Sequence, residues 1–473
     1  MRPLELHPDR LFPPSPTVRP IARRLYGQVA ELPIISPHGH TDPRWFALNE
    51  PFADATGLIV TPDHYLFRML FSQGVPLEEL GVARAGRSPG DADPRAGWRR
   101  FAEHYHLFAG TPSQLWLDWV FAEVFGLSVA LDAESADVYF DTIGGKLATA
   151  EFLPRALFER LRIEVLTTTE SPLDGLEHHR AIRDSDWDGT VLTAYRPDPT
   201  VDPEFGGFRD NVLKLGDITG EDTANWAGYL AAHRRRREFF RDMGATSTDH
   251  GHPSCRTADL DRGDAERLFA RVMHGRTAAE DAELFRAQML TEMALMSIDD
   301  GLVMQIHPGS FRNHSAPVFE RFGRDKGFDI PMRTDYVRAL KPLLDRLGLD
   351  PRLSIILFTL DESAYSRELA PLAGVYPSLK LGPAWWFHDS PGGMRRFREL
   401  TTETAGFWNT VGFNDDTRAF LSIPARHDVA RRIDCAYLAG LVAEHRLGED
   451  LAAGIAVALA YDLPRRAYRL DRA

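Results

Sequence analysis

The sequence predicts an α/β protein built as a (β/α)8 TIM-type barrel. Short apolar runs recur along the chain with helical stretches between them, and strand–helix alternation of this kind produces parallel pairing. About eight such units are present, which is enough for the sheet to close on itself. Polar residues that suit a metal ion or a charged ligand follow most of the runs, and barrel active sites lie where the strands end.

The expected strands are short and mostly aliphatic. In chain order they lie at 32–36, 163–169, 190–195, 245–248, 302–306, 353–358, 379–386 and 410–413. Residues from about 43 to 160 contain no comparable run, and no linker sets their aromatic-rich helical patterns apart. We therefore expect a single domain over residues 1–473, with a large, mostly helical insertion at about 43–160 after the first strand.

The composition excludes several classes of function. The 473 residues are 44% hydrophobic and 26% charged, as in ordinary soluble globular proteins. A net charge of −13 and a pI near 5.7 argue against nucleic acid or an anionic membrane as a partner, and no apolar run approaches the ~20 residues of a membrane span. Two cysteines are too few for a disulfide framework, and the early proline and glutamate do not fit a signal peptide, so we expect a cytoplasmic protein.

A His-x-His pair at the end of the first run is the clearest candidate metal site. Residues two apart on a strand point to the same side, so His38 and His40 can both face one ion. Alone, the pair could equally be solvated loop histidines. His307 follows the fifth run and Asp416 the eighth, and these nitrogen and oxygen donors suit a Zn²⁺-like ion with an open position. The sequence therefore predicts a metal-dependent enzyme.

This arrangement resembles the amidohydrolase superfamily, with two departures. Members that bind two metal ions carry a bridging lysine after the fourth strand, and none of the five lysines of this chain lies there. Those members also carry a histidine after the sixth strand, where this chain has Thr359-Leu360-Asp361-Glu362. The resemblance therefore implies one divalent ion, with Zn²⁺ expected, and argues against hydrolysis.

Further strings narrow the resemblance to the uronate isomerases, a divergent branch of that superfamily. They run in order from about residue 25 to 440, and several are specific to the family. The matching segments are Asp63-His64-Tyr65 with Arg68, Thr167-Thr168-Thr169, Arg196-Pro197-Asp198, Asp249-His250, Gln305-Ile306-His307, Arg312-Asn313, Trp385-Trp386-Phe387 and Asp416-Thr417-Arg418. The chain departs at the first motif, where Ser36 and Pro37 precede His-Gly-His and the family has Asp and Tyr before His-Cys-His.

The resemblance implies an aldose–ketose isomerase of hexuronates, such as D-glucuronate to D-fructuronate and D-galacturonate to D-tagaturonate. A proton moves between C2 and C1 through an enediol, which requires a base, an electrophile and a clamp for the distant carboxylate. By similarity His38, His40 and Asp416 hold the metal. Asp416 is also the preferred base, and Tyr65 and His307 are candidates to carry the second proton.

Arginine is the expected clamp for the substrate carboxylate because its fork can bind both oxygens. Arg196, Arg312 and Arg418 all follow strands, and His64 could join them. Each arginine could instead form a structural ion pair with a loop aspartate. Trp386 could pack on the sugar ring, although a tryptophan at a strand end is part of the core at least as often.

Some alternatives stay open at the level of sequence. His250 lies at the same rim and could be a metal ligand or a substrate contact. The alternative function is a mononuclear metal-dependent hydrolase, supported by superfamily architecture alone. A barrel that only binds a ligand is a third class, which the crowded polar rim disfavours. We expect a small-molecule hexuronate substrate, no nucleic-acid or membrane partner, and a homo-oligomer.

Overall fold

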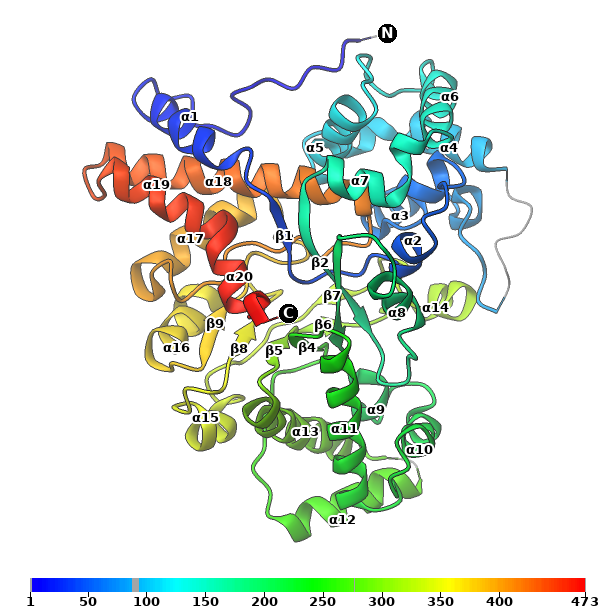
Figure 1. Cartoon of the computed structure of the whole chain (residues 1–473), viewed down its shortest axis with the longest axis vertical. Coiled ribbons are helices and arrows are strands. Elements are labelled where there is room, and N and C mark those ends of the chain that lie inside the picture. The colour runs from blue at the N-terminus through cyan, green and yellow to red at the C-terminus, as the bar shows by residue number, and fades with distance from the viewer. Residues whose placement is uncertain (1, 87–92, 276, 473) are drawn as a thin grey trace.

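A curled sheet of seven parallel strands forms the centre of the structure (Figure 1). The computed structural model describes residues 2–86, 93–275 and 277–472. Neighbouring strands follow the order β1-β2-β3-β4-β5-β8-β9, and each pairing is parallel. Their bounds are Ile34–Ser36 (β1), Ile163–Glu170 (β2), Thr190–Tyr195 (β3), Ser247–His250 (β4), Val303–Ile306 (β5), Ile355–Leu357 (β8) and Leu379–Leu381 (β9). The predicted barrel-type α/β fold is confirmed.

The predicted eighth strand at 410–413 is wrong, because only a single parallel bridge joins Thr410 to Leu381 of β9. Gly412 has a φ of +77°, which interrupts the extended backbone that a strand needs. A Cβ at this glycine would lie 2.5 Å from the carbonyl oxygen of Leu459, so the C-terminal helices hold the segment in this shape. The segment still occupies the eighth position, since the N–H of His40 donates to the carbonyl of Thr417 at 3.0 Å.

Helices follow the strands and cover the outside of the sheet (Figure 1). Those after β2 to β5 are α8 (Glu177–Arg183), α9 (Asp198–Val201), α10 (Phe208–Thr219), α11 (Trp226–Asp242), α12 (Arg262–His274), α13 (Ala279–Asp300), α14 (Ala316–Phe322) and α15 (Lys341–Leu347). Those after β8 are α16 (Ala370–Val375), α17 (Pro391–Ala405), α18 (Ile423–Ala443), α19 (Glu449–Val457) and α20 (Leu463–Ala467). A short antiparallel ribbon, β6 (Ser310–Phe311) with β7 (Ile330–Pro331), lies beyond β5.

The insertion is helical, as predicted, and packs around its own aromatic core. Its helices are α2 (Pro43–Leu48), α3 (His64–Ser72), α4 (Pro94–Glu103), α5 (Pro112–Trp119), α6 (Ala136–Leu147) and α7 (Pro154–Arg160). Trp98 and Phe121 are fully buried there, whereas residues 87–92 lie outside the described part of the chain. The side chain of Asp63 accepts the N–H of Tyr65 and begins α3, which brings this helix to the carboxyl ends of the strands.

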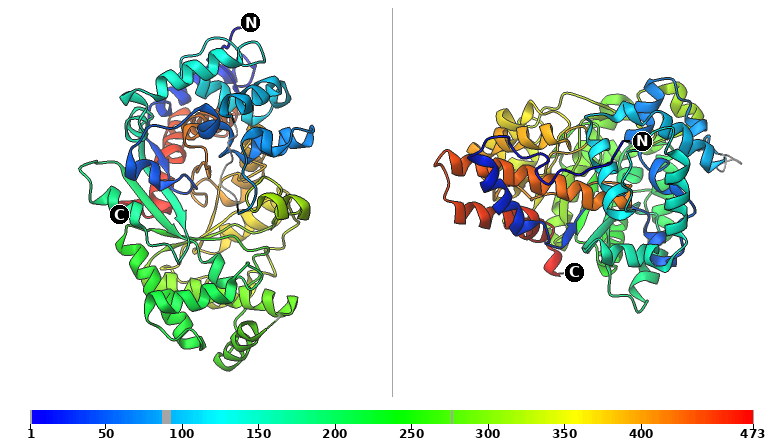
Figure 2. Two further views of the ribbon diagram at one scale, coloured as in Figure 1. Left: turned by 90° about the vertical axis from the view of Figure 1, so that its right-hand side faces the viewer. Right: turned by 90° about the horizontal axis from the view of Figure 1, so that it is seen from above.

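The N-terminal helix and the C-terminal helices pack together on one side of the barrel. Helix α1 (Val18–Val29) packs against α18 and α19, as Figures 1 and 2 show. After α20 the chain enters the barrel interior, where Tyr468 is buried among Ile35, Val303 and Ile356. The described residues include no helix that is long and apolar enough to cross a membrane.

The phenol of Tyr468 joins the C-terminal segment to the floor of the barrel. Its hydroxyl donates to Oε1 of Gln305 at 3.0 Å and accepts from Nδ2 of Asn414 at 2.9 Å. The amide nitrogen of Gln305 in turn lies 3.4 Å from Nδ1 of His38. Tyr468, near the end of the chain, therefore holds Gln305 beside His38, the first predicted metal ligand.

Tyr468→Phe should destabilise the protein by about 1–3 kcal/mol, because it removes the hydroxyl that pairs with two buried atoms, Oε1 of Gln305 and Nδ2 of Asn414. Urea unfolding followed by circular dichroism measures the change. Tyr461→Phe is the matched control, since among the described residues the hydroxyl of Tyr461 bonds only to the partly exposed Glu164 and Arg465. Equal losses in the two variants would contradict the structural role of Tyr468.

Candidate active site

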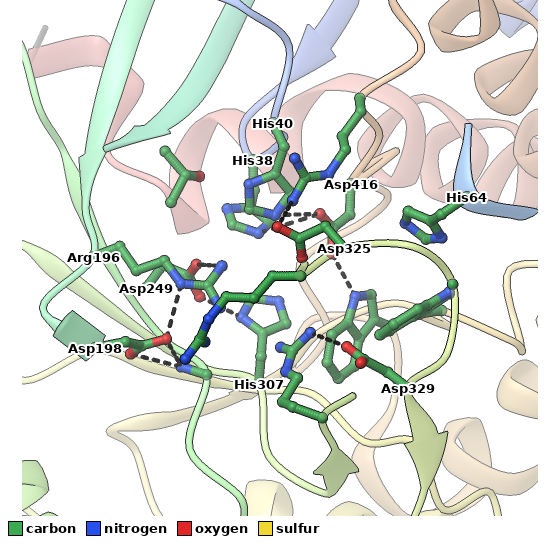
Figure 3. A pocket seen from close by; sticks show the side chains of 18 of the residues that line it. His38, His40, His64, Arg196, Asp198, Asp249, His307, Asp325, Asp329 and Asp416 are labelled. Atoms are coloured by element: carbon green, nitrogen blue, oxygen red, sulfur yellow. Dashed lines mark hydrogen bonds and ion pairs between the residues drawn. The ribbon is translucent and has the colours of Figure 1, made fainter. Parts of the chain in front are cut away.

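A cavity of about 380 Å³ opens at the carboxyl ends of the strands (Figure 3). The structure brings together in its wall all but one of the residues singled out in the sequence, including every predicted catalytic and metal-binding residue. Those lining it are His38, His40, His64, Tyr65, Arg196, His307, Arg312, Trp386, Asp416 and Arg418. Segments almost 380 positions apart in the chain therefore meet at one place.

His38 and His40 both face the carboxylate of Asp416 at the floor of the cavity (Figure 3). Their Nε2 atoms lie 3.5 Å and 3.1 Å from the same oxygen, Oδ1. Burial lowers the pKa of His38 to about 4, although Asp416 and Asp249 favour its charged form. The ring of His38 is therefore neutral at pH 7, as a metal ligand must be.

The backbone conformation of Asp416 orients its side chain toward His38 and His40. Its φ of +37° is unusual for a residue other than glycine, and conformations of this kind collect at functional sites. The indole N–H of Trp385 donates to Oδ2 of Asp416, which leaves Oδ1 toward the histidines. Burial disfavours the carboxylate, yet the attraction of His38 and His40 outweighs it and lowers the pKa of Asp416. Asp416 is therefore ionised at neutral pH.

Asp249, the third residue of β4, links His307 to Arg196. Its Oδ1 lies 2.7 Å from Nδ1 of His307, and its Oδ2 lies 2.9 Å from a terminal nitrogen of Arg196. Despite burial, Arg196 and His307 hold the pKa of Asp249 well below its ordinary value. The ring of His307 is stacked between Phe358 and His38, with centroids 3.9 Å and 4.8 Å away.

These side chains form two overlapping groups that could hold a metal ion. One consists of His38, His307 and Asp416, and the other of His38, His40 and Asp249, with the donor atoms of each group within 4.8 Å of one another. Both groups use His38, so they describe one site. Nε2 of His307 is buried and has no hydrogen-bond partner in the described chain, as expected of an atom reserved for a ligand. The donor set therefore fits a metal ion.

Tyr65 approaches the cavity from α3 in the insertion. Its hydroxyl donates to Asp389 at 2.8 Å and accepts the N–H of Phe387 at 3.1 Å, while Arg426 binds the other oxygen of Asp389 at 2.7 Å. Burial, together with the charge of Asp389, raises the pKa of Tyr65 well above its ordinary value. Tyr65 is therefore a fixed, protonated phenol.

Each of the three predicted arginines forms an ion pair with an aspartate. Arg196 pairs with Asp198 at 2.9 Å in addition to Asp249, Arg312 pairs with Asp329 at 2.8 Å, and Arg418 pairs with Asp325 at 3.3 Å. The side chain of Arg196 is 26% exposed, that of Arg312 is 32% exposed and that of Arg418 is 40% exposed. In contrast, His38 at the floor is 1% exposed. The arginines therefore stand progressively nearer the mouth of the cavity.

Two further predicted residues, His64 and Trp386, also line the cavity. The ring of His64 meets Trp386 edge-on, with centroids 5.0 Å apart. Burial lowers the pKa of His64 to about 3, and the nearby Arg418 adds to this, so the ring is neutral. Nδ1 of His64 and the indole nitrogen of Trp386 are buried without a hydrogen-bond partner among the described residues. Both are available to a ligand.

The structure does not bring His250 to the cavity. Side chains alternate along a strand, so His250 faces the helices when Asp249 faces the cavity. The Nε2 atom of His250 lies 3.0 Å from the hydroxyl of Thr248 on the same side of β4. Asp249 was named from the sequence only within a matching segment and was given no role, and the alternation within Asp249-His250 was the signal that could have shown that it faces the cavity.

The comparisons with known proteins agree with this geometry. A family model described as glucuronate isomerase matches residues 17–466. The chain belongs to the glucuronate isomerase family. A uronate isomerase from Rhizorhabdus wittichii is 70% identical to it over 468 residues, which cover 99% of both chains.

Solved structures of this family share the fold of the whole chain. The crystal structure of glucuronate isomerase from Caulobacter crescentus is 63% identical, covers 99% of this chain and 98% of its own, and gives a TM-score of 0.98. The uronate isomerase structure from Thermotoga maritima, at 26% identity, covers 98% and 99% of the two chains and gives a TM-score of 0.91. The arrangement of the barrel and its insertion thus persists while most residues change.

Glu170 is a cavity-lining residue of this family member that the sequence analysis did not single out. It ends β2, and its carboxyl group accepts the hydroxyl of Thr193 and lies 3.7 Å from Nε2 of His179. Burial raises the pKa of Glu170 to about 8, against the hydrogen bonds of Thr168 and Thr193, which lower it. The carboxyl group is therefore mostly neutral at pH 7.

Replacing Glu170 by Gln should change the pH dependence of stability. An unfolded glutamate has a pKa of about 4.3, so between that value and about 8 the folded protein binds more protons. The free energy of unfolding should therefore fall as the pH rises through this window and level off above it. Urea unfolding at several pH values should show this fall, about 1 kcal/mol or more, in the wild type and its loss in Glu170→Gln. Parallel profiles would contradict the raised pKa.

Proposed function

We propose that the protein interconverts the aldose and ketose forms of hexuronates, D-glucuronate with D-fructuronate and D-galacturonate with D-tagaturonate. One observation carries the proposal: in a member of the glucuronate isomerase family, a histidine–aspartate cluster lies at the floor of a cavity with arginines nearer its mouth. The floor suits the reacting C1 and C2 atoms, and the arginines suit the carboxylate at the other end of the sugar. The proposed orientation of the substrate therefore has C1 and C2 at the floor of the cavity and the carboxylate toward its mouth.

The proposed cofactor is one Zn²⁺ ion held by His38, His40 and Asp416. Neutral imidazole and carboxylate donors are those that Zn²⁺ prefers, and the two candidate groups coincide at His38. The ion, when bound, would polarise oxygens of the sugar and stabilise negative charge that develops on them. Asp249 acts from behind this site by fixing the ring of His307.

Proton transfer is assigned to three side chains. Asp416 is the proposed base, since its lowered pKa keeps a carboxylate at the cavity floor at neutral pH. Tyr65 is the first proposed proton carrier; its single hydroxyl proton, held by Asp389 in this structure, would turn to the oxyanion of the enediol when the sugar is bound. His307 is the second proposed proton carrier, because Asp249 occupies Nδ1 while Nε2 has no partner among the described residues.

The substrate carboxylate is proposed to bind at Arg196, Arg312 and Arg418, with His64 and Trp386 beside the sugar. A carboxylate that enters must share or displace an aspartate already present on each arginine. Arg418 has the longest of these aspartate contacts and the most exposed side chain of the three, so its exchange costs least. The bound sugar would then be held at both ends.

Purified protein incubated with D-glucuronate or D-galacturonate should form the corresponding ketose, detected by NMR or a colorimetric ketose assay. Removal of metal with a chelator should lower the rate, and added Zn²⁺ should restore it, since the ion stabilises developing charge. The absence of ketose from both uronates would contradict the proposed function. Hydrolysis of an amide or lactone without ketose formation would support a metal-dependent hydrolase instead.

Two variants test the role of Asp416 in this assay. Asp416→Asn should lower kcat by about 10²–10⁴-fold, as expected for loss of a general base, and should weaken Zn²⁺ binding. Asp299→Asn removes an equal charge from the exposed face of α13, where the aspartate side chain is 65% exposed, and should keep full activity. Full activity of Asp416→Asn would refute its role.

The same proposal extends to the state of the protein in the cell. We propose that it works in the cytoplasm as a homo-oligomer whose chains are each a single domain. The two free cysteines, both buried, are compatible with a reducing compartment. Sedimentation velocity of the purified protein reports its oligomeric state.

A further inference from the structure

Residues 323–329, which we name the strap, connect α14 to β7 and contribute four residues to the cavity wall. Gly327 packs so closely on α3 that a Cβ there would lie 2.5 Å from the carbonyl oxygen of His64. The φ angles of Gly323 and Gly327 are both +80°, which glycine adopts without strain. The backbone of the strap therefore has a defined position beside the insertion.

The strap carries a fourth cavity-lining arginine, Arg324, whose surroundings differ from those of the others. Arg196, Arg312 and Arg418 each pair with at least one aspartate, as described above. Arg324 forms no ion pair or side-chain hydrogen bond within the described residues, and its guanidinium lies 4.1 Å from the ring centroid of Phe205. Phe205 also lines the cavity, so the ring holds the charge of Arg324 at the wall.

Acidic side chains outnumber arginines in the cavity wall, so an arginine without a paired aspartate can attract an anionic ligand. Besides the mostly neutral Glu170, eight aspartates and four arginines line the cavity: Asp198, Asp202, Asp249, Asp325, Asp329, Asp389, Asp415 and Asp416, with Arg196, Arg312, Arg324 and Arg418. An anionic sugar that approaches this wall is repelled unless a cation offers donors that no aspartate already occupies. Arg324 is exposed, so it also meets an incoming ligand early.

We propose that Arg324 binds the carboxylate of the hexuronate at the mouth of the cavity and selects uronates over neutral aldoses. This inference rests on the proposed isomerase function. Its guanidinium can bind both oxygens of the carboxylate without first releasing a protein aspartate. The adjacent Asp325 already pairs with Arg418, so Arg324 is the cation of the wall whose donors need not be released first. Arg324 is thus a specificity residue whose contact with the carboxylate persists in the bound state.

Steady-state kinetics with D-glucuronate test the proposal. Arg324→Met keeps the apolar packing on Phe205 but removes the charge, and it should raise KM about tenfold or more with kcat within about twofold. Arg324→Lys should lie between the wild type and Arg324→Met, since it keeps the charge but loses the fork. High salt should reduce the difference between the wild type and Arg324→Met, because the interaction is electrostatic.

Arg333→Met is the matched control, because Arg333 is also exposed, forms no ion pair among the described residues, and is absent from the cavity wall. Its KM should equal that of the wild type. A KM of Arg324→Met within about threefold of Arg333→Met, or a loss confined to kcat, would overturn the inference. Failure of the proposed function itself is distinguishable, because the wild type would then form no ketose.

Discussion

The buried carboxylate of Asp249 is the constraint on which the arrangement of the site depends. It joins the ends of three neighbouring strands, since Arg196 follows β3, Asp249 belongs to β4 and His307 follows β5. A charge this deeply buried is tolerable only with partners, and removing one partner of such a pair costs about 3–5 kcal/mol. Through His307 the same carboxylate fixes the ring stacked on His38. The contacts that stabilise the buried charge of Asp249 therefore also position His307 beside His38.

Exposure of the polar side chains increases from the floor of the cavity to its mouth. His38 and Asp249 are 1% exposed, whereas the side chain of Arg418 is 40% exposed. Electrostatic interactions strengthen as water is excluded, so proton transfer is best served at the floor. Recognition of a carboxylate tolerates water and gains from early contact with solvent. The proposed direction of the sugar in the cavity follows from this gradient.

Strand–helix alternation predicted the fold, because it is a local periodicity. Strand-end residues and the family resemblance together predicted ten of the residues that line the cavity. The eighth strand was predicted wrongly because Gly412 takes a left-handed conformation that the C-terminal helices impose. The sequence raised the pairing of each arginine with a loop aspartate as an alternative, but it did not predict which aspartate pairs with which arginine or the position of Arg324 on the strap. Both depend on which loops meet across the barrel, and loop contacts leave no periodic signal in sequence.

We propose that one metal ion, held at His38, serves sugar isomerisation in this cavity. Isothermal titration of the metal-free protein with Zn²⁺ tests it most directly, because the two candidate groups share that histidine. One equivalent of Zn²⁺ per chain in the wild type, and none bound with comparable affinity in His38→Ala, is the predicted result. Two equivalents per chain, or unchanged binding in His38→Ala, would contradict the account.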